Sequence, residues 1–346
     1  MRRALLAWMV GALLPAAAVA TPLDLWPQAA RASIEAAVDH APAGSYATFD
    51  GDNTSWKYDI EEALLPYLEN EGMLSAAKLD PALAPIPLRP GESLYGYYRR
   101  LCDVDDKLCY PWVAQIFSGI PLGTLKREVD RMIAGAKPIP VRYRVDGRTV
   151  SDTVMPPRVM AAQRQLFAYL RTHGVRVYLV TAASEELARM VAADPRYGLD
   201  IAPQDVIGVT LLLRDPADGS VTTARQQIAA GHFLDAAYTP ARHARMVMTP
   251  TLWTPLTWYE GKVGGIQAYI DPVRRPVLAA GDSPSDWPML FYAGGVRIWV
   301  DRHGSATPAL RGERTRRAAS EAAAKLTPPL GADRGWVVAP QEMLAR

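Results

Sequence analysis

The sequence has 346 residues, of which 49% are hydrophobic and 21% charged. Its 38 Lys and Arg against 36 Asp and Glu give a formal net charge of +2, which falls to zero without Arg2 and Arg3. This balance excludes recruitment of nucleic acid by bulk charge, and the hydrophobic content is enough to bury a substantial core. The length suits one catalytic domain plus a smaller unit.

The N-terminus predicts an export signal. A basic start, Met1-Arg2-Arg3, precedes a short apolar run, and the small residues Ala18-Val19-Ala20 follow it. We therefore predict a signal peptide over residues 1–20 and a periplasmic or secreted protein with no stable membrane association after cleavage. A retained membrane anchor is the alternative, but Pro15 and the small residues suit cleavage better than a spanning helix of about 20 residues.

The first strand-like run, over about residues 45–49, ends in two acids. It leads into Asp50-Gly51-Asp52-Asn53-Thr54. In an extended segment residues i and i+2 point the same way, so Asp50 and Asp52 can enter one pocket. One carboxylate can then attack phosphorus while the other moves protons to the leaving group and from water. Asp and Asn are also common in surface turns, so this segment alone does not establish a site for phosphate transfer.

About a hundred residues separate Thr54 from the next buried-strand pattern, too many for a loop. We predict a mainly helical cap domain over residues 57–150, with its clearest helices at 61–68 and 122–133. The catalytic core then comprises residues 21–56 and 151–346. An insert at this point lies over the catalytic pocket, where it can exclude water and select the substrate.

The predicted cap is rich in aromatic residues and also carries acids. Ring faces bind quaternary ammonium ions, and a nearby carboxylate adds to the attraction without a hydrogen bond. We name Tyr97 and Trp112, with Glu62 and Glu92, as candidate substrate-binding residues. The alternative is that these aromatics form the cap's own small core.

The only cysteines are Cys102 and Cys109. In an oxidising compartment their close spacing predicts a local disulfide. The chain-entropy formula gives such a small loop about 2.5 kcal/mol, enough to brace a cap loop but not to hold the fold. Two unpaired buried thiols are the alternative, and metal binding is disfavoured because no histidine lies nearby.

A second buried strand runs from about 175 to 181, after a helix predicted over 158–173. It ends at Thr181, whose hydroxyl can donate to a phosphate oxygen or simply terminate the strand. Residues 206–228 predict a hairpin around the turn at 215–219. Farther along, Lys262 lies among glycines at a helix start, where its ammonium can neutralise an attacking aspartate and the phosphoryl group.

A third apolar strand, about 276–280, breaks at Gly281 and is followed by Asp282 and Asp286. Magnesium binds oxygen ligands, usually one or two carboxylates plus substrate phosphate, so Asp50 and Asp282 can share a metal ion. Asp286 can brace that site or orient Lys262. Beyond it, residues 307–325 predict a solvated helix.

These segments together resemble the four motifs of the haloacid dehalogenase superfamily, in the same order and over about residues 45–300. The matching residues are Asp50, Asp52, Thr54, Thr181, Lys262, Asp282 and Asp286. The resemblance implies an α/β fold, with a Rossmann-like three-layer core around a parallel sheet and a mainly helical cap inserted between motifs one and two. The second aspartate implies a phosphatase or phosphotransferase.

A narrower resemblance comes from the runs that begin at Asp50, Tyr110 and Leu256. They look like the exported phosphorylcholine phosphatases of Gram-negative bacteria, which hydrolyse phosphocholine with a divalent metal. In that family Glu62 falls in a stretch implicated in choline binding. This chain departs from the family at Thr181, where the family has serine, and in the spacing of the acids after Asp282.

The resemblance implies a metal-dependent phosphomonoesterase that acts through an aspartyl phosphate. Asp50 is then the nucleophile and Asp52 the general acid and base, while Thr181 and Lys262 bind phosphoryl oxygens. Mg²⁺, or another divalent cation, is held by Asp50, Asp52 through its carbonyl, and Asp282, with Thr54 and Asp286 in support. The expected substrate is phosphocholine or phosphoethanolamine. The alternatives are another small phosphate ester, phosphotransfer, or a periplasmic protein that binds choline-like cations without turnover.

Overall fold

A computed structural model describes residues 22–145, 147–232, 241–304, 306–326 and 330–346. The predicted signal peptide therefore lies outside the described residues. Within the described ranges, no helix combines the length and the apolar character that crossing a bilayer requires.

The core is built on a mainly parallel sheet in the order β12-β11-β10-β1-β6-β7-β8, and β9 also pairs with β7. From β12 to β7 every neighbouring pair is parallel, whereas β8 and β9 lie antiparallel to β7. The strands are β1 (Tyr46–Phe49), β6 (Arg176–Ser184), β7 (Val206–Arg214), β8 (Val221–Thr222), β9 (Val247–Trp253), β10 (Leu278–Gly281), β11 (Val296–Asp301) and β12 (Trp336–Pro340). This sheet confirms the predicted α/β class, and β7–β8 is the predicted hairpin.

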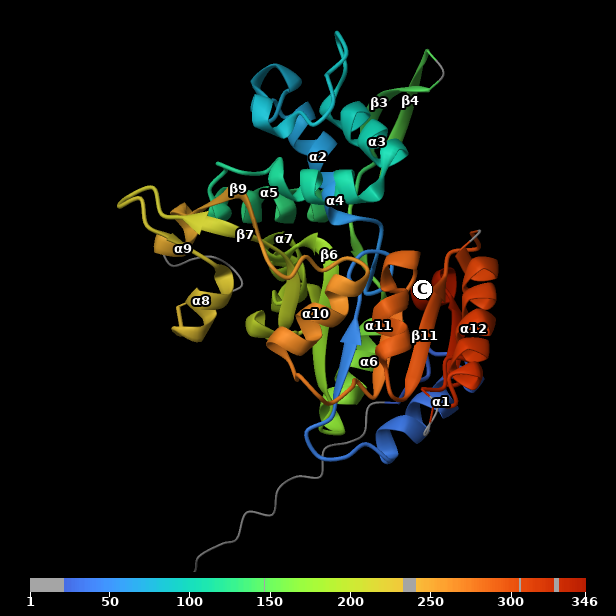
Figure 1. Ribbon diagram of the computed structural model, residues 1–346. Helices are drawn as coiled ribbons and strands as arrows, with labels where there is room; N and C mark the ends of the chain where they lie inside the picture. The colour runs from blue at the N-terminus through green and yellow to red at the C-terminus, as the bar shows by residue number, and fades with distance from the viewer. Residues whose placement is uncertain (1–21, 146, 233–240, 305, 327–329) are drawn as a thin grey trace, which may run out of the picture.

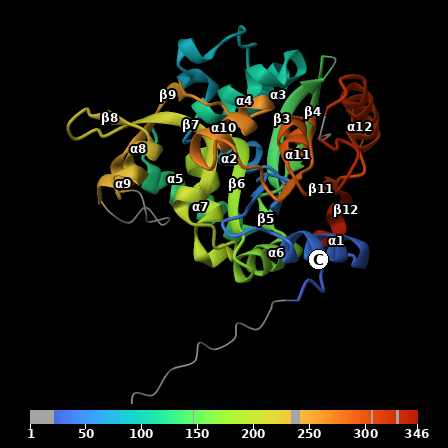
Figure 2. The same ribbon diagram turned by 60° about the horizontal axis from the view of Figure 1, so that its bottom comes forward.

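Helices cover both faces of the sheet (Figures 1 and 2). Alternate residues of β1 and β6 enter two separate cores: Phe49 and Leu179 pack with one set of helices, and Tyr46 and Val180 with the other. The first set includes α1 (Gln28–Asp39), α6 (Ala161–Thr172) and α7 (Glu185–Ala192); the second includes α10 (Glu260–Tyr269), α11 (Trp287–Tyr292) and α12 (Ala306–Ala323). Burial on both faces explains why these strands read as continuous apolar runs.

The insert between β1 and β6 forms a mainly helical cap that stands over one end of the sheet (Figure 1). Helices α2, α3, α4 and α5 each have an apolar side, and these sides pack on one another and on the core. The cap elements are α2 (Ile60–Asn70), η1 (Ala76–Lys78), η2 (Pro81–Leu83), α3 (Leu94–Val104), α4 (Asp106–Gln115), α5 (Leu122–Gly135), β3 (Ile139–Val145) and β4 (Arg148–Val154). Helices α2 and α5 are the two that the sequence predicted most clearly.

Two details bear on the predicted limits of the cap. Strand β4 crosses residue 150, so that boundary falls inside a hairpin. A short antiparallel pair, β2 (Trp56–Lys57) with β5 (Arg158–Val159), joins the two ends of the insert. We therefore propose that the cap runs between β2 and β5. Residues 158 and 159 form a strand, so the predicted helix over 158–173 begins later, at Ala161.

The remaining elements surround the sheet edges. They are η3 (Pro195–Tyr197), η4 (Pro203–Asp205), α8 (Ala224–Ala229), α9 (Ala241–Arg245), η5 (Pro284–Asp286) and α13 (Gln341–Leu344). The predicted helix at 307–325 is α12, whose mostly exposed residues agree with a solvated surface.

Candidate active site

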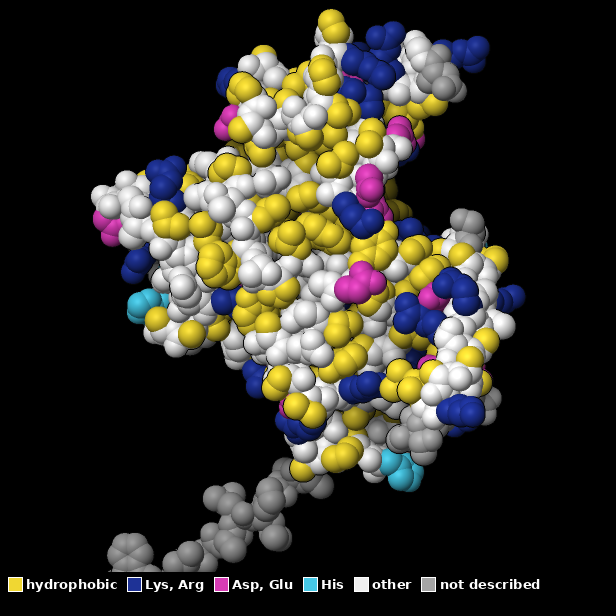
Figure 3. All heavy atoms as spheres, viewed as in Figure 1, with side chains coloured by type: hydrophobic (Ala, Val, Ile, Leu, Met, Phe, Trp, Pro, Cys, Tyr) yellow, Lys and Arg dark blue, Asp and Glu magenta, His cyan; other side chains and the backbone are white. Residues whose placement is uncertain are grey.

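A cavity of about 230 Å³ lies where the carboxyl ends of β1, β6 and β10 face the cap. The surface is hollowed where cap and core meet, and acidic and basic side chains gather beside the hollow (Figure 3). Parallel strands that end at one edge of a sheet bring their following loops together, which places the predicted motifs in one site. The residues that line the cavity are Asp50, Asp52, Asn53, Asp59, Glu61, Glu62, Tyr98, Tyr110, Val113, Thr181, Ala182, Ala183, Asp282, Ser283, Ser285 and Arg302.

Asp50, Lys262 and Asp286 form a buried ion triad. The Nζ atom of Lys262 lies 2.5 Å from Oδ1 of Asp50 and 2.5 Å from Oδ1 of Asp286. Burial alone would lower the pKa of Lys262, but the two carboxylates raise it above its usual value. Lys262 therefore stays charged and holds Asp50 at the end of β1. The sequence suggested that Lys262 neutralises Asp50 and that Asp286 braces the metal site or orients Lys262, and both ion pairs of Lys262 are present in the structure.

The segment before Lys262 is tightly bent. Tyr259 has φ 50° and ψ −127°, in the region that favours glycine. A Cβ on Gly261 would come within 1.6 Å of the Leu256 carbonyl oxygen, so only glycine fits there. The bend starts α10 so that Lys262, fully buried, points to Asp50.

Asp52 reaches the cavity by a turn rather than by an extended strand. β1 ends at Phe49, and the amides of Thr54, Ser55 and Trp56 all donate to the Gly51 carbonyl. The Oδ1 atom of Asp52 accepts from Trp56 Nε1 at 2.6 Å and from the Ile60 amide at 2.9 Å. The expected placement of both aspartates in one pocket thus holds, but the expected i, i+2 geometry does not.

The second oxygen of Asp52 makes no hydrogen bond among the described residues. Burial raises the pKa of Asp52 well above its usual value, and the Asp59 and Asp50 charges add to this effect. A raised pKa lets a carboxyl group keep its proton to higher pH, which suits a general acid.

The loop after β10 presents Asp282 and uses Asp286 as its brace. Oδ2 of Asp286 accepts from the amides of Asp282 and Ser283, at 3.0 and 2.9 Å, and from the Ser283 hydroxyl. A Cβ on Gly281 would lie 2.4 Å from the Asp286 Cβ, so the tight loop needs glycine at this position. Asp282 accepts a hydrogen bond from Thr54 Oγ1 at 2.8 Å and has Arg302 Nε at 3.3 Å.

Asp50, Asp282 and Asp286 form a group that can bind a metal ion, with one oxygen from each within 4.8 Å of the others. Burial and the Asp286 charge raise the pKa of Asp50 to about 7, and burial with the same neighbour raises the pKa of Asp282 well above its usual value. Three acids thus surround one lysine, so the site has more acidic groups than Lys262 can neutralise. A divalent cation fits this donor set, because hard cations bind carboxylate oxygens.

Thr181 lies at the cavity wall in β6 and is almost fully buried. Its Oγ1 accepts from the Ala183 amide at 3.2 Å, which leaves the hydroxyl hydrogen available. The Thr257 hydroxyl donates to the Thr181 carbonyl at 2.7 Å and so links this strand end to the segment before Lys262.

The cap side of the cavity carries three further acids and two tyrosines. Asp59 caps α2 by accepting from the amides of Glu61 and Glu62. Burial and Glu62 raise the pKa of Asp59 to about 6, and burial with Asp59 raises that of Glu61 well above its usual value. Glu62 accepts from the Tyr95 hydroxyl at 2.9 Å. Only Tyr98, Tyr110 and Val113 come from α3 and α4.

Three of the four candidate substrate-binding residues do not line the cavity. Glu92 is held by Arg100 through two hydrogen bonds of 2.9 and 2.7 Å. Tyr97 and Trp112 are buried, and donate instead to the Ile86 and Leu83 carbonyls at 2.7 Å each. These two aromatics belong to the cap's core, which was the alternative interpretation. Glu62 is the one of the four at the cavity.

Sequence reasoning missed Asp59, Glu61, Tyr98, Tyr110 and Arg302 as cavity residues. Asp59 had a local signal only as a helix start, because glutamates follow it two and three residues later. The tyrosines had none that set them apart from the other cap aromatics. Arg302 follows β11, and the strand-end argument that found the four motifs applies equally there.

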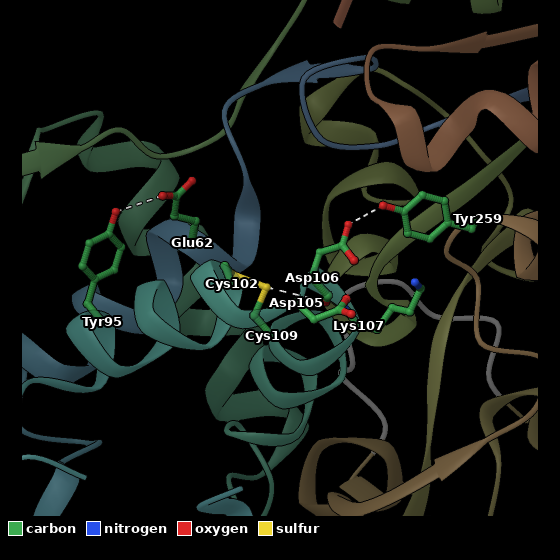
Figure 4. Close-up of a disulfide and its surroundings, with 8 residues drawn as sticks. All are labelled: Glu62, Tyr95, Cys102, Asp105, Asp106, Lys107, Cys109 and Tyr259. Carbon is green, nitrogen blue, oxygen red and sulfur yellow. Dashed lines mark hydrogen bonds between the residues drawn. A yellow bond between two sulfur atoms is a disulfide. The ribbon is translucent and has the colours of Figure 1, made fainter. Parts of the chain in front are cut away.

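Cys102 and Cys109 form the predicted disulfide, with 5.0 Å between their Cα atoms. It joins the end of α3 to the first turn of α4 (Figure 4), and neither cysteine lines the cavity.

No protein-family model matches the chain. The chain is 46% identical over 349 aligned residues to the phosphorylcholine phosphatase of Pseudomonas aeruginosa, and the match covers 97% of this chain and 98% of that protein. A solved protein of unknown function from Anaerococcus prevotii matches with a TM-score of 0.57 and 16% identity, over 84% of this chain and 90% of that one. A HAD family hydrolase from Salmonella enterica matches with a TM-score of 0.41 and 14% identity, over 75% and 63%. The Anaerococcus likeness concerns the fold alone.

Proposed function

The chain belongs to the phosphorylcholine phosphatase family, and on that basis we propose that it hydrolyses phosphocholine to choline and phosphate through an aspartyl phosphate. Asp50 attacks phosphorus, and Asp52 gives its proton to the departing choline oxygen. Asp52, now ionised, takes a proton from a water molecule as that water attacks the aspartyl phosphate. Phosphate is released, and Asp50 and Asp52 return to their starting forms.

The other site residues stabilise charge in this scheme. Lys262 offsets the charge of Asp50 and of the phosphoryl oxygens, and the Thr181 hydroxyl donates to one of those oxygens. Asp50, Asp282 and the Asp52 carbonyl would hold Mg²⁺, which when bound supplies positive charge to the phosphoryl group. Asp286 is excluded as a ligand in our proposal, because its two oxygens already hold Lys262 and the loop.

The acidic lining of the cavity is the observation that supports phosphocholine as the substrate. Its lining includes six acidic side chains and one arginine. A phosphate ester without its own cation gains nothing from the acids at the cap side, whereas an ester with a cation is attracted to them at its cationic end. A quaternary ammonium needs ring faces and a carboxylate nearby rather than a hydrogen-bond acceptor. Tyr98 and Tyr110, with Asp59 and Glu62, supply both at the cap side.

Phosphate release tests this function directly. We expect the mature protein to release phosphate from phosphocholine and from p-nitrophenyl phosphate, to lose at least about 100-fold in rate when a chelator removes the metal, and to recover with added Mg²⁺. Release from the nitrophenyl ester alone would keep the mechanism and reject phosphocholine. No release from either ester would favour a binding protein without turnover.

Glu62→Gln tests the cation site separately. The variant removes one negative charge but keeps an oxygen for the Tyr95 hydroxyl. We expect KM for phosphocholine to rise about tenfold, because an ion attraction of about 1.4 kcal/mol is lost, with KM for p-nitrophenyl phosphate within about twofold of wild type. Steady-state kinetics on both esters measures this.

Glu92→Gln is the matched control, since Glu92 is a cap acid that pairs with Arg100 and does not line the cavity. It should leave both KM values unchanged. An equal rise for both esters in Glu62→Gln would contradict the cation site.

The disulfide supports an extracytoplasmic location, because disulfides persist in oxidising compartments. We propose export through the predicted signal peptide to the periplasm or the medium.

A further inference from the structure

The first turn of α4 contacts the segment that delivers Lys262 to the active site (Figure 4). The Tyr259 hydroxyl donates to Oδ2 of Asp106. The Lys107 ammonium lies 5.5 Å from the centre of the Tyr259 ring. One turn farther along α4, the Tyr110 ring meets the Trp258 ring edge-on, with 6.4 Å between centroids. Three contacts from α4 thus join the cap to residues 258 and 259. The proposed mechanism gives neither of these two residues a role.

Tyr259 needs such contacts because of its backbone. Its φ of 50° with ψ of −127° is unfavourable for any residue with a side chain, and such a conformation persists only where surrounding groups impose it. The next turn begins with Gly261 against the Leu256 carbonyl and then presents Lys262 to Asp50. A relaxed Tyr259 would therefore displace the start of α10 and the ammonium of Lys262 with it.

The disulfide fixes the other end of this connection. Cys109 lies in the first turn of α4, and its bond to Cys102 holds that turn against the end of α3. The same two helices bring Tyr98 and Tyr110 to the cavity. The position of α4 therefore affects both the cation side of the cavity and the lysine behind the nucleophile.

We propose that Asp106 and Tyr259 are positioning residues: their hydrogen bond, held in place by the Cys102–Cys109 disulfide, keeps the bent 258–262 segment in the conformation that sets Lys262 on Asp50. The proposal rests on the proposed function for its kinetic consequence, since it concerns Lys262 as a group that stabilises the phosphoryl transfer. The geometric claim, that α4 restrains the segment before α10, does not depend on any substrate.

A second hydrogen bond between cap and core offers a matched control. The Tyr197 hydroxyl, from the core, donates to Oδ1 of Asp130 in α5 at 2.7 Å. This bond also joins a core tyrosine to a cap aspartate, but it lies beside the Lys126–Asp194 ion pair, and neither of its residues lines the cavity. If the Tyr259 bond served only to hold the cap to the core, loss of either hydroxyl would have a similar effect on turnover.

The experiment compares Tyr259→Phe, Asp106→Ala, their double variant and Tyr197→Phe. We expect the first two to lower kcat for p-nitrophenyl phosphate about tenfold, and the double variant to fall no further than either single one, because all three remove one bond. Tyr197→Phe should keep kcat within about twofold of wild type. Hydrogen exchange of residues 254–266, followed by mass spectrometry, should be faster in the first three variants and unchanged in Tyr197→Phe.

Hydrogen exchange separates this proposal from the proposed function, because it needs no substrate. If wild type fails to hydrolyse phosphocholine while exchange still rises in Tyr259→Phe, the substrate is wrong and the restraint stands. If exchange of residues 254–266 stays at the wild-type rate in both single variants, or if Tyr197→Phe loses as much kcat as Tyr259→Phe, the proposal is wrong.

The disulfide gives a second test that does not depend on Asp106 or Tyr259. Replacement of both cysteines by serine should reproduce the faster exchange of residues 254–266 and a fall in kcat of about threefold or more, measured at a temperature well below the variant's Tm. Wild-type exchange and kcat in a folded double-serine variant would overturn the role of the disulfide.

Discussion

Asp50→Asn should reduce phosphate release by at least about four orders of magnitude with any ester, because an amide cannot form the covalent phosphoryl bond that the mechanism requires. The loss should appear in kcat and should be the same for phosphocholine and for p-nitrophenyl phosphate. Incubation with substrate followed by mass spectrometry should detect an added phosphoryl group on wild type during turnover and none on the variant.

The same substitution should leave the fold intact. Burial raises the pKa of Asp50 to about 7, so the folded protein disfavours the ionised form relative to the unfolded chain. The stability that the neutral form provides is fully present below the usual carboxyl pKa and is lost as the pH rises through about 7. Asparagine is neutral at every pH, so in the presence of a chelator at pH 8 the variant should melt at or above the wild-type Tm. Residual turnover above one part in a thousand, in a variant that melts normally, would contradict Asp50 as the nucleophile.

The residues that sequence reasoning found share a local signature. Asp50, Thr181 and Asp282 each follow a continuous apolar run, and burial on both faces of a parallel sheet produces such runs directly. Their meeting at one edge follows from the topology of parallel strands and needs no knowledge of individual side-chain contacts. Lys262 lacks that signature and was found through the order of the motifs.

The cap residues could not be found in the same way. Tyr97 and Tyr98 are neighbours on one helix, yet one belongs to the cap's core and the other lines the cavity. Which of them faces the site depends on how α3 packs against α2 and α4, and that packing is a tertiary property. Glu92 illustrates the same limit, because it lies just before α3 and its partner Arg100 lies eight residues away within that helix.

The backbone of the site was also beyond sequence reasoning. An extended strand was a reasonable expectation for Asp50 and Asp52, but the Gly51 carbonyl collects three amides and turns the chain immediately. The bend at Tyr259 gave no sign in the sequence, since the usual indicator of such a conformation is glycine. The bend at Tyr259 is also held by a side chain that is distant in sequence, Asp106.

Asp52→Asn should separate the two chemical steps. Asparagine keeps the oxygen that accepts from Trp56 and Ile60, so the turn should remain in place, but it carries no transferable proton. With phosphocholine, whose alkoxide is a poor leaving group, we expect kcat to fall about 1000-fold, within the range for loss of a general acid. Trp56→Phe is unsuitable as a control, because it removes the Trp56 hydrogen bond to Asp52 and so alters the turn. The Tm of Asp52→Asn itself reports whether the fold is retained.

With p-nitrophenyl phosphate the same variant should behave differently. Nitrophenolate leaves without protonation, so Asp50 should still be phosphorylated, whereas water attack on the aspartyl phosphate lacks its base. Rapid mixing should therefore show a burst of about one nitrophenolate per enzyme, followed by slow steady release, and the phosphorylated enzyme should accumulate. The raised pKa of Asp52 suits it to the first role, and ionisation after proton transfer prepares it for the second. Linear release without a burst, at the same fractional loss for both esters, would mean that Asp52 shapes the site but moves no proton in it.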